Sequence, residues 1–124
     1  RIIGAAGAGF PSPAQDWEED GISLVELLRL DRAASFVFRI SGWSMLDAGI
    51  HDHDIVVVDR DTTPRDGHIV IATVDSGFVC RQIASRGGGV FLEARNSRQS
   101  YEATPAEGVE IWGVVRACVR DFQR

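Results

Sequence analysis

Short apolar runs separated by turn residues constrain the fold of this chain more than any other feature of its sequence. The runs alternate in hydrophobicity or are apolar throughout, as strands are, and they lie at residues 35–40, 54–59, 68–74, 78–83, 90–93 and 109–122. Glycine, proline and aspartate dominate the short connections, whereas residues 96–108 are expected to form a longer polar loop. About six strands at these intervals predict a mostly β fold, namely a curled antiparallel sheet or partial barrel.

A single short helix is expected before the first strand. Ser23-Leu24-Val25-Glu26 matches the capping-box pattern, which predicts a helix from Ser23 to about Leu30. Residues 1–20 are rich in glycine, alanine, proline and acidic side chains, which predicts a flexible N-terminal arm. We therefore expect an arm at 1–20 and one folded domain at 21–124. Because the chain starts at Arg1, we also expect it to be part of a longer protein.

Charge and composition exclude several classes of protein. The net charge is −5, the pI is about 5.1 and no run of basic residues occurs, which argues against direct, specific DNA binding. No apolar stretch is long enough to span a membrane. The two cysteines, Cys80 and Cys118, suggest no disulfide framework, so a reduced, cytoplasmic setting is the simpler interpretation. All 13 basic residues are arginine, and lysine is absent from the sequence.

Ser44 is the candidate nucleophile. The strand-like run at 35–40 leads through Gly42 to this serine, and a short polar turn then leads to the next strand. Glycine lets the backbone bend sharply, so that the hydroxyl can project from the end of an ordered element. A helical turn beginning at Ser44 would direct free N–H groups at the oxygen and favour negative charge there. By spacing alone, such a serine more often belongs to an ordinary turn or helix N-cap.

The segment Ser41-Gly42-Trp43-Ser44-Met45, followed by Asp47-Ala48-Gly49-Ile50 and a hydrophobic strand, resembles the LexA/UmuD-like family of self-cleaving serine peptidases. Residues 8–14, 22–28 and 69–75 resemble the UmuD branch of this family, and the resemblance runs from about Gly9 to the C-terminus. It implies a sheet of the LexA C-terminal-domain type with Ser44 as nucleophile. The backbone N–H groups of Trp43 and Ser44 are the candidate oxyanion hole. The resemblance implies no cofactor and no metal.

Arg81 departs from the family pattern. The resemblance places the lysine base of a Ser-Lys dyad at this position, and the separation of 81 − 44 = 37 residues is the family's spacing. Lowering a lysine pKa from about 10.4 to about 7.5 costs about 4 kcal/mol, whereas the same end point costs an arginine about 8.5 kcal/mol. Arg81 is therefore expected to stay charged and to hydrogen-bond Ser44 without removing its proton. Self-cleavage should then be very slow or absent, whether the arginine is native or engineered.

Alternatives to this interpretation of Arg81 and its surroundings remain open. Arg81 could instead be an edge-strand residue with its head group in solvent. Histidine titrates near neutral pH, so His51, His53 or His68 could replace the missing base. The run His51-Asp52-His53-Asp54 also suggests a metal site, but no further ligands are evident, and a solvated turn is predicted.

The resemblance places the bond to be cut between Ala8 and Gly9. Small residues would let an extended arm lie against Ser44 without side-chain clashes, and Gly7 and Gly9 would keep it flexible. The 44 − 9 = 35 residues between Gly9 and Ser44 are enough to reach the chain's own site or that of a dimer mate. By composition alone, residues 4–9 would be a plain linker.

The resemblance also implies partners. It predicts an SOS-response protein whose self-cleavage is stimulated by a RecA–single-stranded DNA filament. The shortened homodimer, joined around residues 111–119, would then serve a UmuC-like Y-family translesion DNA polymerase. One alternative is a non-cleaving dimeric binding module for the polymerase or RecA. Another is the C-terminal domain of a LexA or phage repressor, which would need a DNA-binding domain elsewhere.

Overall fold

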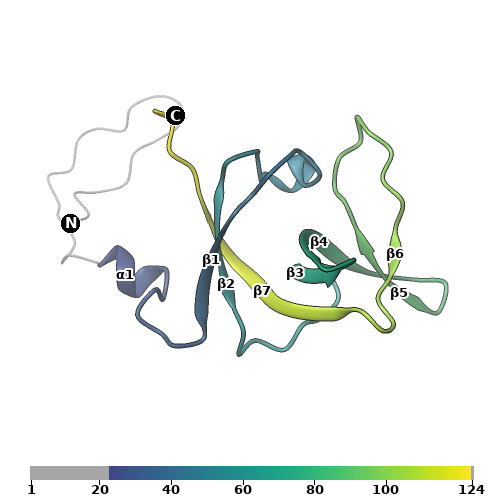
Figure 1. Cartoon of the computed structure of the whole chain (residues 1–124), viewed down its shortest axis with the longest axis horizontal. Helices are drawn as coiled ribbons and strands as arrows, with labels where there is room; N and C mark the ends of the chain where they lie inside the picture. The colour runs from purple at the N-terminus through teal and green to yellow at the C-terminus, as the bar shows by residue number, and fades with distance from the viewer. Residues whose placement is uncertain (1–22, 124) are drawn as a thin grey trace, which may run out of the picture. The chain divides into compact units, whose positions relative to one another are not determined.

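The computed structural model describes residues 23–123 of the chain (Figure 1). The chain divides into two compact units, with the boundary between Asp31 and Arg32. The first contains a short helix and the second contains a β-sheet. The predicted arm at 1–20, including the bond between Ala8 and Gly9, lies outside the described residues and stays a prediction.

The helix α1 (Leu24–Leu27) begins where the capping pattern predicts but is shorter than expected. Ser23 is the N-cap residue, although its side chain makes no capping hydrogen bond. The prediction of a helix to Leu30 is wrong because Arg29 adopts a left-handed φ of 57°. The Leu30 N–H then donates to the Val25 carbonyl at 2.8 Å, which closes the helix end. No helix within residues 23–123 is long and apolar enough to cross a membrane.

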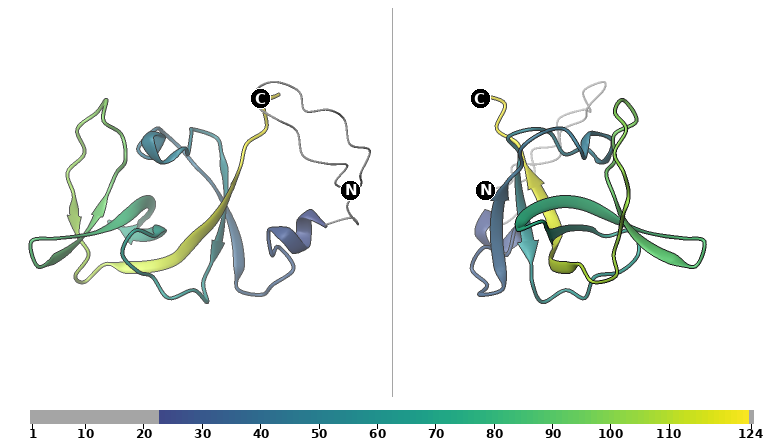
Figure 2. Two further views of the ribbon diagram at one scale, coloured as in Figure 1. Left: turned by 180° about the vertical axis from the view of Figure 1, so that it is seen from behind. Right: turned by 45° about the vertical axis from the view of Figure 1, so that its right-hand side comes forward.

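The second unit holds one seven-stranded sheet in the order β1-β2-β7-β3-β4-β5-β6, with every pair antiparallel (Figures 1 and 2). The order has two ends, so the sheet is open, and the predicted mostly β fold with a short helix is confirmed. The polar loop predicted at 96–108 contains a further short strand, which pairs with β5. The strands are β1 (Ser35–Arg39), β2 (Ile55–Asp59), β3 (Ile69–Val74), β4 (Gly77–Arg86), β5 (Gly89–Glu93), β6 (Thr104–Pro105) and β7 (Glu110–Val119).

The long strand β7 joins the two parts of the sheet. Its N-terminal half pairs with β3 and its C-terminal half pairs with β2, and Val114 pairs with both neighbours. The register shifts once on each side, and β7 is bent along its length in Figures 1 and 2. A Cβ atom at Gly113 would lie 2.5 Å from Cγ1 of Val58, so a larger residue here would have to displace that side chain, which favours glycine.

Two hydrophobic clusters form because successive residues of a strand face opposite sides of the sheet. Val70 and Ala72 of β3 belong to one cluster and Ile71 to the other. The apolar run at residues 55–58 is typical of a strand covered on both sides, and Val56, Val57 and Val58 are fully buried while Ile55 is half-buried. The first cluster supports the Ser44 turn through Met45, which is 1% exposed; its members are Ile40, Met45, Ile50, Val56, Val58, Ile71 and Cys80.

Candidate active site

Ser44 lies in a tight turn between β1 and β2. Gly42 adopts a φ of 94°, which favours glycine, and its N–H donates to Oδ1 of Asp52 at 2.7 Å. The Leu46 N–H donates to the Trp43 carbonyl at 3.1 Å, and the 3-10 helix η1 (Leu46–Ala48) follows. The helical turn therefore begins two residues after Ser44, later than the sequence analysis considered. The serine precedes the helix and is held in place by the buried Met45.

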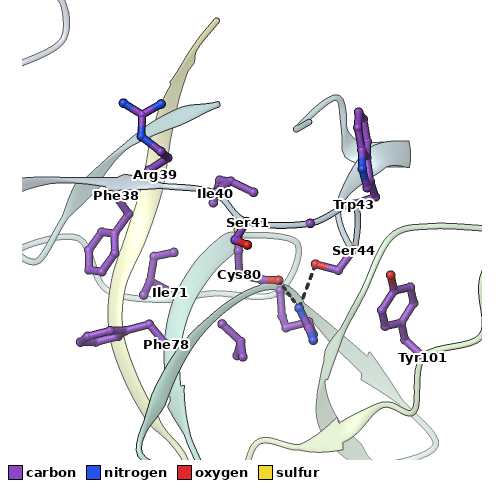
Figure 3. A pocket seen from close by; sticks show the side chains of 13 residues that line it. Phe38, Arg39, Ile40, Ser41, Trp43, Ser44, Ile71, Phe78, Cys80 and Tyr101 are labelled. Carbon is purple, nitrogen blue, oxygen red and sulfur yellow. Dashed lines mark hydrogen bonds between the residues drawn. The ribbon is translucent and has the colours of Figure 1, made fainter. Parts of the chain in front are cut away.

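Arg81 of β4 meets the Ser44 hydroxyl. Its Nη1 atom donates to Oγ of Ser44 at 3.0 Å and to the carbonyl of Cys80 at 2.8 Å, as the dashed lines in Figure 3 show. The expected hydrogen bond is thus present. At Arg81 the strand pairs with Val70 of β3, and its pairing with β5 begins at Gln82. The alternative of a head group in solvent is wrong, because the guanidinium binds Ser44 in a part-buried site. The guanidinium is the donor in this contact, so the hydroxyl oxygen accepts a hydrogen bond and keeps its own proton.

A cleft of about 350 Å³ contains this pair. Figure 3 shows Phe38 and Phe78 at one end of the cleft and Tyr101 at the other, with Ser44 between them. The rings of Phe38 and Phe78 pack edge to face, with centroids 5.1 Å apart. The Tyr101 ring centroid lies 5.8 Å from the guanidinium carbon of Arg81. The cleft thus offers an apolar wall that leads to one polar, positively charged end.

Arg95, which the sequence analysis did not single out, fixes the Ser44 turn. Its N–H donates to the Ser44 carbonyl, and its carbonyl accepts from the Asp47 N–H, both at 2.7 Å. Its Nη1 atom donates to Oε1 of Gln82 at 2.8 Å, so one residue connects the Ser44 turn to the strand that carries Arg81. Two of these three bonds use backbone atoms, which every residue type has. No residue pattern in the sequence could therefore have indicated these two backbone hydrogen bonds.

Asp54 forms a second polar centre behind the Ser44 turn. Its side chain is buried, and it accepts hydrogen bonds from the His51 N–H at 2.8 Å and from Nε and Nη2 of Arg120 at 2.8 and 2.7 Å. Arg120 also donates to the Gly49 carbonyl at 2.8 Å. The prediction that residues 51–54 form a solvated turn is wrong for Asp54, which is 2% exposed. Its hydrogen bonds to Arg120 hold the pKa of Asp54 well below the ordinary value, and burial opposes them.

Both cysteines are free thiols with little thiolate character. Burial raises the pKa of Cys80 to about 12. Burial, followed by the hydrogen bond that its thiol donates to Asp54 at 3.4 Å, raises the pKa of Cys118 to about 11. Since the thiolate is the reactive form, neither thiol is suited to act as a nucleophile near neutral pH.

The three histidines have neighbours other than Ser44. The His51 ring packs against Trp43 with centroids 5.5 Å apart, and His53 lies 3.3 Å from the Asp52 carboxylate. Nδ1 of His68 accepts the Arg65 N–H at 3.0 Å. In the part of the chain that the structure describes, no group of three or more His, Cys, Asp or Glu side chains is arranged to hold a metal ion.

Comparison with known proteins adds a family match. A family model described as Peptidase S24-like matches residues 1–116, a range that includes Ser44 and Arg81. Protein MucA of Salmonella typhimurium is 39% identical over 109 residues, which cover 87% of this chain and 75% of MucA. Protein ImpA of Shigella flexneri is 38% identical over 108 residues, which cover 87% of this chain and 74% of ImpA. Protein SamA of Salmonella typhimurium strain LT2 is 35% identical over 112 residues, or 90% of this chain and 78% of SamA.

Proposed function

The chain belongs to the Peptidase S24-like family of serine peptidases, as its LexA/UmuD-like motifs predicted, and from this we propose a UmuD-like function in SOS mutagenesis. In this proposal Ser44 is the nucleophile and the bond between Ala8 and Gly9 is its substrate. The observation that carries the proposal is the 3.0 Å hydrogen bond between Ser44 and Arg81, because Arg81 stands at the position of the family's lysine base.

The proposed reaction begins with attack of Oγ of Ser44 on the carbonyl carbon of Ala8. The backbone N–H groups of Trp43 and Ser44 would stabilise the resulting oxyanion. The amine of Gly9 would leave with the proton taken from the serine, and water would then hydrolyse the ester between Ser44 and Ala8. A base must take the serine proton during the attack, and the Arg81 guanidinium cannot do so because it has no lone pair to offer while charged. We therefore expect cleavage by the unmodified chain to be very slow or absent.

The donor role of Arg81 also supports a second candidate function, that of a non-cleaving dimeric binding module. In both versions the partners are a RecA–single-stranded DNA filament and a UmuC-like Y-family polymerase, and the chain acts as a homodimer. The free thiols of Cys80 and Cys118 are compatible with the cytoplasmic setting that these partners require. The two candidates differ only in whether the arm is ever cut.

Replacing Arg81 with lysine separates the two candidates. We expect the Arg81→Lys variant, incubated at alkaline pH, to lose its N-terminal piece and expose Gly9 as the new N-terminus. A positioned general base contributes about 100-fold or more to the rate, so the difference from the unmodified chain should be plain by intact mass spectrometry. Adding a RecA filament should accelerate this cleavage.

The matched control is the double variant Ser44→Ala, Arg81→Lys, which keeps the base and lacks the nucleophile. It should give no product. Brisk cleavage of the unmodified chain would show that Arg81 does not prevent the reaction. An uncut Arg81→Lys variant would count against Ser44 as the nucleophile and leave the binding module as the better candidate.

A further inference from the structure

The Arg81 guanidinium carries donors that no described residue uses. Within residues 23–123, Nη1 donates to Ser44 and to the Cys80 carbonyl, and no carboxylate forms an ion pair with Arg81. A guanidinium presents several N–H donors in a planar fork and accepts nothing. Arg81 is therefore a partly buried cation, in a cleft, whose charge is not neutralised by a neighbour in the described part of the chain.

The Ser44 hydroxyl beside Arg81 adds one further donor to the cleft. The Ser44 oxygen already accepts from Nη1, so its hydroxyl proton is free to be donated into the cleft. The Cys80 carbonyl, the acceptor nearest to the guanidinium, already receives a hydrogen bond from it. A planar anion with two oxygens matches this set, since a carboxylate accepts from guanidinium and hydroxyl donors alike.

The rest of the cleft suits a peptide. Apolar side chains continue away from the charged end, among them Phe38, Ile71, Phe78 and Val79. An extended chain that ended at Arg81 could lay its preceding residues along this wall. Arg39 also lines the cleft, but its Nη1 atom donates to the His53 carbonyl at 3.1 Å, and Figure 3 shows its head group directed away from Ser44.

We propose that the cleft is a receptor for the C-terminal carboxylate of an extended peptide, which binds Arg81 and Ser44. A protonated lysine would offer one compact charge here, whereas arginine offers a fork that can bind both carboxylate oxygens. Arginine at the position of the family's lysine would thus remove the general base and at the same time let the cleft bind a peptide C-terminus. The inference rests on the proposed function in one respect, which is the choice of probe. The probe is the peptide of residues 3–8, and it ends at Ala8, the residue before the proposed cleavage site.

The test is isothermal titration calorimetry of the full chain with this peptide as free acid and as C-terminal amide. We expect the acid to bind about 10-fold more tightly or better, because a charge-assisted hydrogen bond is lost in the amide. An amidated peptide with aspartate as its last residue should bind like the plain amide. Equal affinities for acid and amide, no binding of either, or equal binding of the aspartate amide would each overturn the proposal.

Two arginine variants locate the site. Arg81→Met keeps much of the side-chain volume but removes the charge, and it should abolish the preference for the acid. Arg39→Met removes the other arginine of the same cleft and should keep that preference. A preference that survives Arg81→Met, or disappears in Arg39→Met, would overturn the assignment. The comparison of acid with amide needs no variant, so it remains decisive if Arg81→Met does not fold.

This result is independent of the cleavage experiment. If Arg81→Lys cleaves itself but the unmodified chain ignores the peptide carboxylate, only the receptor inference fails. If the unmodified chain binds the carboxylate but Arg81→Lys remains uncut, the receptor stands and the proposed cleavage fails.

Discussion

Two arginines lie close to the Ser44 turn, and their surroundings are opposite in kind. Arg120 faces the buried carboxylate of Asp54, to which it donates two hydrogen bonds, and it ties the end of the chain to Gly49. Arg81 faces the hydroxyl of Ser44 and the carbonyl of Cys80, both neutral acceptors. Only the first arginine forms an ion pair with an acidic side chain in the described part of the chain.

This difference separates a structural role from a functional one. A buried carboxylate such as Asp54 is stabilised only while its partners are in place, so the folded state depends on them. A partly buried cation without a carboxylate contributes less to folding and remains available to a ligand. We therefore expect changes at Asp54 to affect stability and changes at Arg81 to affect chemistry.

The largest effect on stability is expected for Asp54→Ala. This change leaves the Arg120 guanidinium and the His51 N–H without their acceptor. Loss of the hydrogen bonds to a buried carboxylate costs about 2 kcal/mol, and the exposed Arg120, which keeps its bond to the Gly49 carbonyl, adds no buried-charge penalty. Urea unfolding followed by circular dichroism measures it.

Asp75→Asn is the matched control for that change. Asp75 is exposed in a turn with a φ of 51°, a conformation that asparagine tolerates. Its free energy of unfolding should therefore stay within about 0.5 kcal/mol of the unmodified value. If Asp54→Ala were as mild as this control, the Asp54–Arg120 pair would not be the structural centre described above.

A smaller effect is expected from acid. The pKa of Asp54 is lowered in the folded state, mainly by its hydrogen bonds to Arg120, so folding favours the ionised form. The resulting stabilisation is fully present above the unfolded pKa of about 3.9 and is lost as the pH falls below it towards the folded pKa. The free energy of unfolding should thus fall less steeply below about pH 4 in Asp54→Asn than in the unmodified chain. Parallel curves for the two proteins would contradict a lowered pKa at Asp54.

Apart from the control, the smallest effect on stability is expected for Arg81→Met. The variant loses hydrogen bonds to two neutral acceptors and gains apolar contact in the same cleft. These changes offset each other, so the free energy of unfolding should change by about 1 kcal/mol or less. A loss as large as that of Asp54→Ala, measured by the same urea titration, would mean that Arg81 is as structural as Arg120.

Much of the fold was predictable because strand patterns are local. Runs such as residues 55–58 are apolar throughout, and turn residues separate them from their neighbours. The length of α1 was not predictable from its capping pattern, because the left-handed turn at Arg29 uses a residue without a special preference for it. The two-residue strand β6 is too short to produce a periodic pattern.

The residues of the candidate site could be predicted where their side-chain type indicates their role. They could not be predicted where the role depends on tertiary contacts. Ser44 and Arg81 were indicated by the family resemblance of the residues around them, and the structure brings the two side chains to 3.0 Å. Asp54 lies in a polar run that is typical of a surface turn, and the arginine that pairs with its buried carboxylate is 66 residues away in the sequence. Arg95 supports the Ser44 turn largely through backbone atoms, which leave no mark in the sequence.

The most direct test of the account is the reactivity of the Ser44 hydroxyl itself. A fluorophosphonate that labels activated serines should leave the unmodified chain unlabelled from pH 6 to about pH 10, because Arg81 cannot accept the serine proton. In Arg81→Lys the labelling of Ser44 should appear and rise with pH as the lysine becomes neutral. Rapid labelling of Ser44 in the unmodified chain, identified by peptide mass spectrometry, would contradict the central claim.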